Sequence, residues 1–465
     1  MGYYRIKDSF VLRGWEKLPW ALVQRPHNRV SFLSKEAFDA LSLCNGRCDC
    51  SMKIIPQQIR SLIAQAQKEG VVEPCAYGEG LHADQEYYQY PNRFIKLAHW
   101  SVTGKCNYKC RHCYMSAPDA KLGELPHETV MDMIEQIAAC GILRVSITGG
   151  EPLIRKDWWE MIDALVQHKI WITTIYTNGA LVNEALLDGL KERGLCPEFN
   201  MSYDGDEGWH DWLRGIPGAE GAVLKAFDLC FEKGFPTGAE MCLHKGNLHL
   251  LRQSIHTLAV HHCTSLKTNP VSDTELWSEH GEGYALDMEK LYEAYLDYVP
   301  QYFEDGAPVS LMLGGFFQCK MGTRNWCIPL EKYDGGDSCL RQTLCGHARQ
   351  VLYISPESRM LPCLSLSAFD IQKDYPKITD IGLRRGLTDS VYMSLIDTRV
   401  EEYLKRTREC ADCTYAKICA GGCRASALMD APDDIMAPDR AACRLFRGGW
   451  ADRLKACMEQ VGQEC

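Results

Sequence analysis

The sequence lacks the features that would place the protein on nucleic acid or in a membrane. Its formal net charge is −10 over 465 residues, whereas binding to phosphate backbones requires a basic surface. No apolar run approaches the roughly 18 residues of a bilayer-spanning helix, and the N-terminal MGYYRIKDSF has no apolar core like that of a secretory signal. We therefore expect no nucleic-acid partner, no membrane and a cytoplasmic location.

Cysteine, in contrast, is abundant, with 24 residues in the chain. Disulfide scaffolds are usually short secreted chains. Many thiols in a reducing compartment point instead to metal or redox chemistry. Some of these residues are expected to be ordinary buried thiols, since free cysteine behaves as a small hydrophobe. Cysteines that cluster closely along the chain need a different explanation.

The first part of the chain has the pattern of a small separate module, which we assign to residues 1–85. Two β-prone runs, SFVLRGW and WALVQR, are followed by two helical segments. Ser34 is suited to cap the first helix, and Pro56 opens the second. Two strands followed by helices resemble a winged helix. Residues 86–96 are predicted to be a linker.

Residues 97–305 alternate short apolar strands with amphipathic helices in six βα units. The strands are LAHWSVT, LRVSITG, WITTIYT, EFNMSYDG, TGAEMCLH and SLKTNPV. Regular alternation predicts an α/β fold in which helices cover a parallel sheet. Six units predict a partial (β/α)6 barrel of the TIM type, whose reactive groups gather at the C-terminal ends of the strands.

Residues 306–465 lose this alternation and are rich in Gly, Cys and turn residues. The sequence predicts helices here only near 391–406 and 445–460. A region with so few regular elements cannot easily build an apolar core. We therefore expect metal centres to organise it.

The segment CNYKCRHCY directly follows the first predicted strand and places Cys106, Cys110 and Cys113 together. Four thiolates would indicate structural zinc or a closed iron–sulfur cluster. Three thiolates leave one metal position open, and an open position usually serves chemistry. The alternative is a zinc site that takes a fourth ligand, such as His112.

The C-x3-C-x2-C spacing, with aromatic Tyr114 beside the last cysteine, resembles the radical SAM enzymes. The resemblance implies a 4Fe–4S cluster on Cys106, Cys110 and Cys113, with an open iron that binds S-adenosylmethionine (SAM). In that family an electron from the cluster cleaves SAM to methionine and a 5′-deoxyadenosyl radical, which abstracts hydrogen from the substrate. The sequence also implies an external electron donor such as flavodoxin or ferredoxin.

Three later loops extend the resemblance. Gly149-Gly150-Glu151-Pro152 follows the second strand and is similar to the GGEP motif, which holds the amino group of the methionine. Thr177-Asn178-Gly179 follows the third strand and is similar to an element near the cofactor. After the fourth strand, SYDGDEGWHDWLRG implies that Ser202 and Arg214 meet the SAM carboxylate, to which an Arg fork is suited. For Asp204 and His210, local hydrogen bonding and a cofactor role stay equally open.

The C-terminal cysteines resemble the SPASM domain, which extends radical SAM enzymes that act on peptides and proteins. The family's pattern has a glycine where this chain has Ser358. The resemblance implies two auxiliary 4Fe–4S clusters, and three clusters in all. The first would be bound by Cys339, Cys345, Cys363 and Cys423, and the second by Cys410, Cys413, Cys419 and Cys443. Zinc sites are the rival interpretation, because zinc also accepts four thiolates.

The N-terminal pattern resembles the RiPP recognition element, which binds the leader of a ribosomally made precursor peptide by strand addition. Four cysteines in this module, Cys44, Cys48, Cys50 and Cys75, could form a metal site, but their spacing matches no motif that we recognise, and we expect free thiols. Together the resemblances imply a radical SAM/SPASM peptide maturase of the sactipeptide or ranthipeptide type, which joins a cysteine sulfur to a carbon.

Other functions stay open at this stage. Carbon–carbon crosslinking, epimerisation and formylglycine formation use the same set of motifs. A protein without radical chemistry, acting as a leader-binding electron-transfer partner, is a further alternative. The intact C-x3-C-x2-C and GGEP segments argue against that last possibility. The sequence does not identify the peptide, the residues joined, the catalytic acid or base, or whether the first auxiliary cluster has an open iron.

Overall fold

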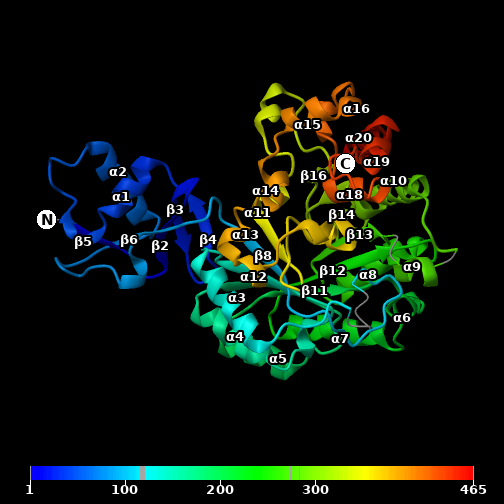
Figure 1. Cartoon of the computed structure of the whole chain (residues 1–465), viewed down its shortest axis with the longest axis horizontal. Coiled ribbons are helices and arrows are strands. Elements are labelled where there is room, and N and C mark those ends of the chain that lie inside the picture. The colour runs from blue at the N-terminus through cyan, green and yellow to red at the C-terminus, as the bar shows by residue number, and fades with distance from the viewer. Residues whose placement is uncertain (1, 116–120, 273–274, 282, 464–465) are drawn as a thin grey trace.

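The computed structural model describes residues 2–115, 121–272, 275–281 and 283–463. Figure 1 shows the N-terminal module at one end of the molecule, connected to a larger body that holds the barrel and the C-terminal region. The elements of the larger body surround one extensive apolar cluster, whereas the module has two small clusters of its own.

The larger body is built around an 11-stranded sheet. Six consecutive strands along the chain run parallel at its centre. They are β8 (Leu97–Ser101), β9 (Arg144–Thr148), β10 (Trp171–Thr177), β11 (Glu198–Ser202), β12 (Thr237–Leu243) and β13 (Ser265–Pro270). These strands lie where the sequence predicts them, and the α/β fold class with a parallel sheet is confirmed.

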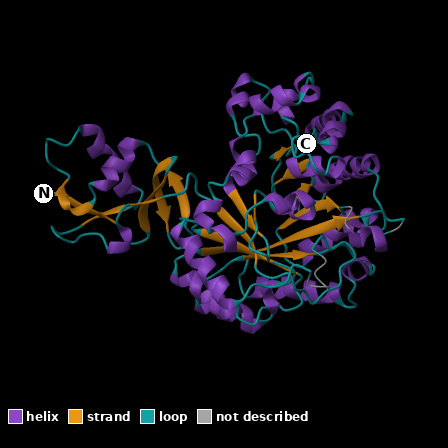
Figure 2. Ribbon diagram, in the orientation of Figure 1, coloured by secondary structure: helices purple, strands orange, loops and turns teal. Residues whose placement is uncertain are grey.

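Helices cover the outer face of this sheet, as Figure 2 shows. They are α3 (His127–Ala139), α4 (Trp158–Gln167), α5 (Glu184–Glu192), α7 (Ala219–Glu232), α8 (Leu251–Val260) and α10 (Met288–Glu304). The spacing of apolar residues explains their orientation: α3 buries Val130, Met133, Ile134 and Ile137, which share one helical face. None of the helices in the described part of the chain has the length and apolar character that a bilayer span requires.

The strands alternate between an apolar outer face and a polar inner face. In β9, Val145 and Ile147 are wholly buried in the core, while Ser146 and Thr148 line a cavity inside the barrel. In β12, Ala239 and Met241 belong to the core, and Glu240 lines the same cavity. Because side chains alternate across a strand, the apolar core lies between sheet and helices, and the interior of the barrel is free for chemistry.

The sheet continues beyond the six predicted units. β14 (Ser310–Leu313) pairs parallel with β13, and β17 (Val351–Ile354) pairs parallel with β8 at the opposite edge. The short antiparallel strands β15 (Phe317–Cys319), β16 (Trp326–Cys327) and β18 (Met360–Leu361) complete it. The C-terminal region thus supplies both edges of the sheet, and the predicted boundary at residue 305 separates two sequence patterns that share one sheet.

The rest of the C-terminal region consists mainly of short helices. The segment expected to be helical near 391–406 forms α14 (Ser390–Asp397) and α15 (Val400–Arg406), and the one near 445–460 forms α19 (Arg440–Arg447) and α20 (Trp450–Gln463). α20 packs against α10, where the Trp450 indole donates to Glu289 at 2.7 Å. The other helices are α11 (Gly346–Gln350), α12 (Ile378–Ile381), α13 (Leu383–Gly386), α16 (Arg408–Ala411), α17 (Ala416–Cys419) and α18 (Arg424–Asp430).

The N-terminal module contains two sheets. One has the order β4-β3-β2-β7 and the other β5-β1-β6. The strands are β1 (Tyr3–Ile6), β2 (Phe10–Trp15), β3 (Leu18–Gln24), β4 (Arg29–Phe32), β5 (Asn45–Asp49), β6 (Val72–Pro74) and β7 (Tyr88–Tyr90). β7 lies in the predicted linker and pairs with β2, so this segment is anchored to the module.

The two helices of the module begin as the sequence predicts. The Ser34 hydroxyl accepts a hydrogen bond from the Ala37 amide at 3.2 Å, and α1 (Lys35–Ser42) follows it. Pro56 directly precedes α2 (Gln57–Lys68), where its missing N–H costs no helical hydrogen bond. Both helices pack on the β5-β1-β6 sheet around Ile6, Leu41 and Ile63.

The module is attached to the barrel at the N-terminal ends of β9 and β10. The Asn28 amide donates to the carbonyls of Leu143 and Lys169 at 2.8 and 2.7 Å, and the His27 ring meets the Trp171 ring edge-on at 4.3 Å. The Trp15 indole donates to the carbonyl of Gly141 at 3.3 Å. The module therefore lies at the opposite end of these strands from the loops that follow them.

Candidate functional site

The three cysteines of CNYKCRHCY lie on the loop after β8, and all three line a cavity of about 470 Å³ inside the barrel. Most of the predicted SAM-binding residues line the same cavity, although they follow three other strands. They are Gly149, Gly150, Thr177, Asn178, Ser202 and Arg214. The parallel sheet thus brings together loops that are up to about a hundred residues apart in the chain, as expected for the C-terminal ends of barrel strands.

The loop after β9 packs tightly against the loop that carries the thiols. The Gly150 amide donates to the Thr103 carbonyl at 2.8 Å, and the Glu151 amide donates to the Lys105 carbonyl at 2.9 Å. A Cβ on Gly150 would collide with the Lys105 carbonyl, and one on Gly149 would lie too close to the Thr103 carbonyl. Glycine is needed at both positions because the two backbones approach so closely.

Glu151 turns away from the cavity and is wholly buried. Its carboxylate accepts hydrogen bonds from the Thr177 hydroxyl at 2.8 and 2.9 Å and from the Asn178 amide at 2.8 Å. Burial raises the pKa of Glu151 to about 7, although the amides of Asn178 and Leu153 and the Thr177 hydroxyl oppose this shift. The sequence predicts that Glu151 meets the amino group of SAM, and this stays a prediction; in the structure its carboxylate connects the loops after β9 and β10. Pro152 follows it and is also buried.

A short helix supports the thiol loop from the other side. α6 (Trp209–Arg214) offers its last carbonyls to this loop: the Lys109 amide donates to Arg214 at 3.2 Å, and the Arg111 amide donates to Leu213 at 2.9 Å. The Arg111 guanidinium lies 4.9 Å from the centre of the Trp212 ring, a distance suited to cation–π attraction. The thiol loop is therefore held between α6 and the glycine loop.

Arg214 points from the end of α6 into the cavity beside the thiols. Its Nε donates to Asp204 Oδ2 at 2.6 Å, and its Nη1 lies 3.9 Å from the Cys110 sulfur. Burial by itself would raise the pKa of Asp204, but the charge of Arg214 holds it well below its usual value. The Asp204 amide also donates to His210 Nδ1 at 3.0 Å. Asp204 thus fixes the side chain of Arg214, and His210 is joined to Asp204 by a local hydrogen bond.

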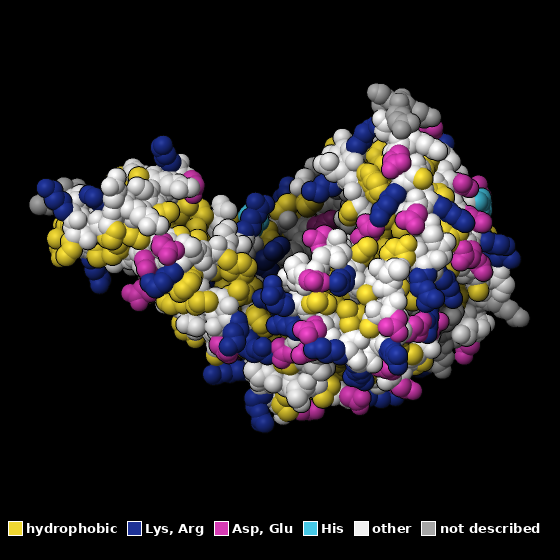
Figure 3. Space-filling model, turned by 90° about the horizontal axis from the view of Figure 1, so that it is seen from above, with side chains coloured by type: hydrophobic (Ala, Val, Ile, Leu, Met, Phe, Trp, Pro, Cys, Tyr) yellow, Lys and Arg dark blue, Asp and Glu magenta, His cyan; other side chains and the backbone are white. Residues whose placement is uncertain are grey.

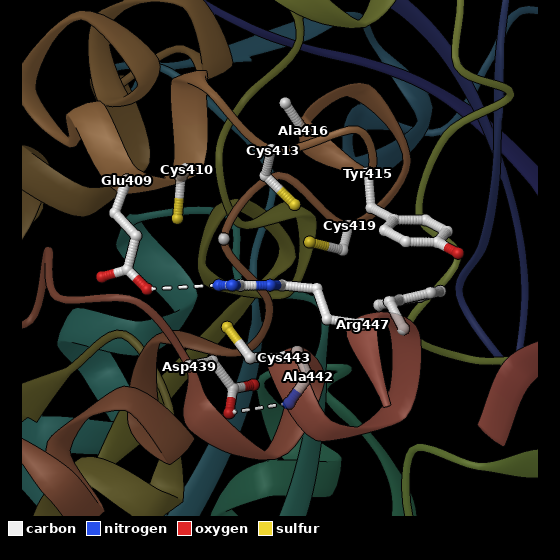
Figure 4. Close-up of a pocket in the computed structure, with 12 residues that line it drawn as sticks. Glu409, Cys410, Cys413, Tyr415, Ala416, Cys419, Asp439, Ala442, Cys443 and Arg447 are labelled. Carbon is white, nitrogen blue, oxygen red and sulfur yellow. Dashed lines mark hydrogen bonds and ion pairs between the residues drawn. The ribbon is translucent and has the colours of Figure 1, made fainter. Parts of the chain in front are cut away.

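Four of the C-terminal cysteines form a compact group. Figure 4 shows the sulfurs of Cys410, Cys413, Cys419 and Cys443 turned toward a shared small cavity, beside the ion pair of Glu409 and Arg447 at 3.5 Å. The Tyr403 hydroxyl lies 3.2 Å from the Cys410 sulfur. These are the four residues expected to hold the second auxiliary cluster, and the chain brings them together from α16, α17, α19 and the loops between them.

A second group contains Cys345, Cys363 and Cys423. The thiol of Cys363 interacts electrostatically with those of Cys423 and Cys345, and burial raises its pKa to about 12. Cys363 also lines the large cavity of the barrel, together with Cys113. Cys339, the fourth expected member, has Lys417, Asp334 and Asp337 as its main charged neighbours.

Ser358 occupies the position where the related pattern has glycine. Its φ is +66°, in the left-handed region that favours glycine. Its hydroxyl forms a hydrogen bond of 2.8 Å with the Thr379 hydroxyl, and its carbonyl accepts from the Ile378 amide at 2.8 Å. The turn before Cys363 therefore keeps its geometry, with local hydrogen bonds compensating for the side chain.

The thiols fit clusters better than single zinc ions. Within residues 2–115, 121–272, 275–281 and 283–463, no three Cys, His, Asp or Glu side chains converge closely enough to hold one metal ion. Zinc draws its thiolate sulfurs to about 2.3 Å, so its ligands must nearly touch. An iron–sulfur cluster is also held by cysteine thiolates but lies between them, so its ligand sulfurs stand further apart, around a shared centre as in Figure 4.

Several cavity residues were not predicted from the sequence. Glu240 and Lys267 form an ion pair of 3.6 Å whose side chains remain roughly half exposed, and both line the cavity. His99 and His347 line it as well; burial lowers the pKa of both rings, that of His99 to about 4. A signal was available for three of them, since His99, Glu240 and Lys267 are polar residues within predicted strands. What could not be deduced was that their strand positions face inward.

Comparisons with known proteins agree with this architecture. Residues 100–253 match the profile of the Radical SAM superfamily. The chain is 32% identical over 187 residues to Fe-coproporphyrin III synthase of Methanosarcina barkeri, which covers 38% of this chain and 46% of that protein. It is 30% identical over 152 residues to PqqA peptide cyclase of Granulibacter bethesdensis, which covers 32% of this chain and 40% of that protein. The match therefore spans less than half the length of these curated relatives.

The fold is similar over a longer range. The crystal structure of Streptococcus suis SuiB bound to precursor peptide SuiA superposes with a TM-score of 0.63 at 15% sequence identity, covering 93% of this chain and 99% of SuiB. At such low identity the likeness concerns the fold alone. The chain thus carries a radical SAM domain, and this domain implies SAM and one 4Fe–4S cluster.

We expect the Gly150→Ala substitution to displace the thiol loop, because the new Cβ collides with the Lys105 carbonyl. The variant should retain less iron after anaerobic reconstitution and bind SAM at least about tenfold more weakly, a loss of roughly 1.4 kcal/mol. Gly221→Ala in α7 is the matched control, since a Cβ there meets no atom within 4 Å. Normal iron content and SAM affinity in Gly150→Ala would contradict the proposed packing.

Glu151 should make stability depend on pH. Its pKa rises from 4.5 in the unfolded chain to about 7 in the folded one, so the folded state binds more protons between these values and loses stability as pH rises through them. Glu151→Gln removes this loss. Urea unfolding without cofactors should therefore favour the variant more at about pH 8 than at about pH 5. Glu160→Gln, on the exposed face of α4, should show no such difference, and an equal effect at both pH values would refute the assignment.

Proposed function

We propose that the chain is a radical SAM maturase that modifies a ribosomally synthesised precursor peptide and closes a thioether between a cysteine sulfur and a carbon. One observation carries the proposal: the three thiols after β8 and Cys363 of the C-terminal region line the same cavity. A substrate in this cavity would lie between the site of radical formation and a second thiol-bound centre. That arrangement suits a reaction that starts with hydrogen abstraction and ends with loss of an electron.

In this proposal Cys106, Cys110 and Cys113 hold the 4Fe–4S cluster whose open iron binds SAM. When bound, the cluster and SAM supply a 5′-deoxyadenosyl radical, after an electron arrives from a donor such as flavodoxin or ferredoxin. The residues of the chain position the cofactor: Arg214, fixed by Asp204, and Ser202 face its carboxylate. The closely packed backbone of Gly149 and Gly150 lets the methionine part approach the thiol loop. Thr177 and Asn178 are held beside it by Glu151.

The C-terminal thiols would hold two auxiliary 4Fe–4S clusters. Cys410, Cys413, Cys419 and Cys443 would bind one, and Cys345, Cys363 and Cys423 the other. Cys339 is the expected fourth ligand of the latter. Because Cys363 faces the cavity, this cluster is the nearer of the two to a bound substrate. Its task would be to accept the electron released when the carbon radical joins the sulfur and the thiol proton leaves.

The cavity offers a path for the substrate. Its lining extends down the barrel to Leu97 and Val351, the first residues of β8 and β17, which lie at the strand ends nearer the N-terminal module. Figure 3 shows that side chains of both charges surround a hollow in the upper face of the molecule. The Glu240–Lys267 pair inside the barrel could orient polar groups of a peptide, since both side chains are accessible from the cavity.

The N-terminal module would bind the leader of the precursor at β4. This strand is one of the two edges of its sheet, whose order is β4-β3-β2-β7, and an extended peptide can add a strand to such an edge. Phe32, at the end of β4, is 55% exposed, and hydrophobic side chains gather on the module in Figure 3. The similar SuiB fold was solved with a precursor peptide bound, which supports a peptide as the substrate class.

The decisive experiment is anaerobic reduction of the reconstituted chain with SAM and its precursor peptide. We expect 5′-deoxyadenosine to form and the peptide to lose two hydrogens, because closing the thioether removes one hydrogen atom from carbon and one from sulfur. Cys106→Ala/Cys110→Ala/Cys113→Ala should form no 5′-deoxyadenosine. Digestion of the product and tandem mass spectrometry would locate the new bond on a cysteine.

Other outcomes of this experiment distinguish the alternatives. An unchanged peptide mass with uptake of solvent deuterium would mean epimerisation, and a two-hydrogen loss without involvement of cysteine would mean a carbon–carbon crosslink. Turnover of an iron porphyrin in place of a peptide would align the chain with its Fe-coproporphyrin relative. Iron and sulfide near four per chain, rather than about twelve, would exclude both auxiliary clusters.

Leader binding has a separate test. Deleting the module would expose the barrel surface that Asn28 and His27 cover, so a point substitution is cleaner. Phe32→Glu should weaken binding of the leader-bearing precursor about tenfold, since burying one large apolar side chain contributes roughly 1.5–3 kcal/mol. SAM cleavage without peptide should be unchanged. Met52→Glu, 54% exposed after β5, is the control. Equal affinities in both variants would argue against β4 as the leader site.

A further inference from the structure

A lysine lies between the two groups of C-terminal thiols, at a place that no sequence motif marks. Lys332 follows β16 and precedes the region of Cys339. Its ammonium donates a hydrogen bond to the carbonyl of Gly422, the residue directly before Cys423. Its backbone amide and that of Tyr333 both donate to the carbonyl of Ile418, directly before Cys419, at 3.0 and 3.2 Å. The Lys332–Tyr333 segment therefore clamps both ends of the turn that separates these two cysteines.

This turn joins the two thiol groups. Cys419 belongs to the group of Figure 4, and Cys423 belongs to the group that includes Cys363. All three residues between them have left-handed backbones, with φ of 45°, 77° and 74° at Ala420, Gly421 and Gly422. Such a turn reverses the chain within three residues, so the two sulfurs serve different sites although they are close in sequence.

The electrostatic surroundings of Lys332 are unusual for a lysine. Its main charged neighbours are the thiols of Cys345, Cys423 and Cys419 and the guanidinium of Arg424, rather than carboxylates. Burial and Arg424 lower the pKa of Lys332, and the three thiols oppose this shift. Burying an ammonium is costly unless opposite charge is near. The negative charge available here is that of the cysteines when they are deprotonated as ligands.

Arg424 is a second cation in the same region, but its contacts are of a different kind. Its guanidinium donates to the carbonyls of Ile435 and Ala437 at 3.1 and 2.8 Å and to that of Gly421, and it lies 4.8 Å from the centre of the Tyr403 ring. These contacts show that Arg424 connects neighbouring loops by hydrogen bonds to their backbone carbonyls. Lys332 also donates to a carbonyl, that of Gly422, but its charged neighbours include ligand thiols of both groups.

We infer that Lys332 is a positioning residue that raises the reduction potential of the auxiliary clusters, so that they can accept the electron released by the substrate. The inference rests on the proposed function, because it requires clusters on these thiols. A reduced cluster carries one more negative charge than an oxidised one, and a fixed cation nearby stabilises the reduced form more. Water screens such a charge less when it is removed from solvent, and Lys332 is partly buried between the two thiol groups.

The test is a redox titration of the full chain, reconstituted with iron and sulfide and followed by electron paramagnetic resonance. It uses the Cys106→Ala/Cys110→Ala/Cys113→Ala background, which removes the SAM-binding cluster and leaves only auxiliary signals. In this background Lys332→Met should make the reduction of at least one auxiliary cluster about tenfold less favourable. This change in the equilibrium constant lowers the midpoint potential by about 59 mV for one electron. Lys332→Arg should keep the potential near that of the parent.

Two further variants separate charge from structure. Lys332→Gln retains an N–H donor for the Gly422 carbonyl but lacks the charge, so it should shift the potential as Lys332→Met does. Lys405→Met removes an exposed lysine of α15 that pairs with Glu401, and it should leave both potentials unchanged because water screens that charge.

The outcomes distinguish this inference from the proposed function. A parent chain with iron near four per polypeptide would overturn the auxiliary clusters and this inference together. About twelve irons in the wild-type chain, about eight in the triple-Ala background, and unchanged potentials in Lys332→Met and Lys332→Gln would overturn the inference alone. Loss of iron in both uncharged variants, with full iron in Lys332→Arg, would also count against it, because the charge would then retain the cluster instead of setting its potential.

Discussion

The close approach of two backbones, at Lys105 and Gly150, is the constraint on which the rest of the site depends. The described part of the thiol loop, residues 102–115, contains no helix or strand, so its position comes from its neighbours. On one side the glycine loop after β9 donates two amide hydrogen bonds to it, and on the other the end of α6 accepts two from it. Since α6 also carries Arg214, the contact that positions the thiols also positions the residue expected to meet the SAM carboxylate.

Buried carboxylates hold the loops and side chains around the cavity in place. Glu151 connects the loops after β9 and β10, and Asp204 holds Arg214. Neither carboxylate needs to touch a cofactor to matter, because each fixes a group that faces the cavity. In the C-terminal region the charged groups are cations in place of carboxylates: Lys332 and Arg424 lie among thiols and carbonyls. In both regions a buried ionic group has neighbours that compensate for the cost of removing it from water.

The sheet explains how one cavity serves two regions of the chain. β14 and β17 extend the six central strands at both edges, so the C-terminal region is continuous with the barrel through backbone hydrogen bonds. Cys363 follows β18 at one of these edges and thereby reaches the cavity that the first three thiols line. The N-terminal module, attached at the opposite ends of β9 and β10, leaves the loops above the thiols uncovered.

Much of this architecture follows from the sequence alone. The six central strands, most of their helices, the Ser34 cap and the grouping of Cys410, Cys413 and Cys419 depend on residues close together in the chain, and local spacing determines them. The orientation of Glu151, the role of Asp204, the two edge strands and the position of Lys332 do not. They depend on which loops the parallel sheet brings side by side, across up to about 250 residues of chain. Only the tertiary structure decides such pairings, because hydrogen bonds between distant backbones leave no periodic trace in the sequence.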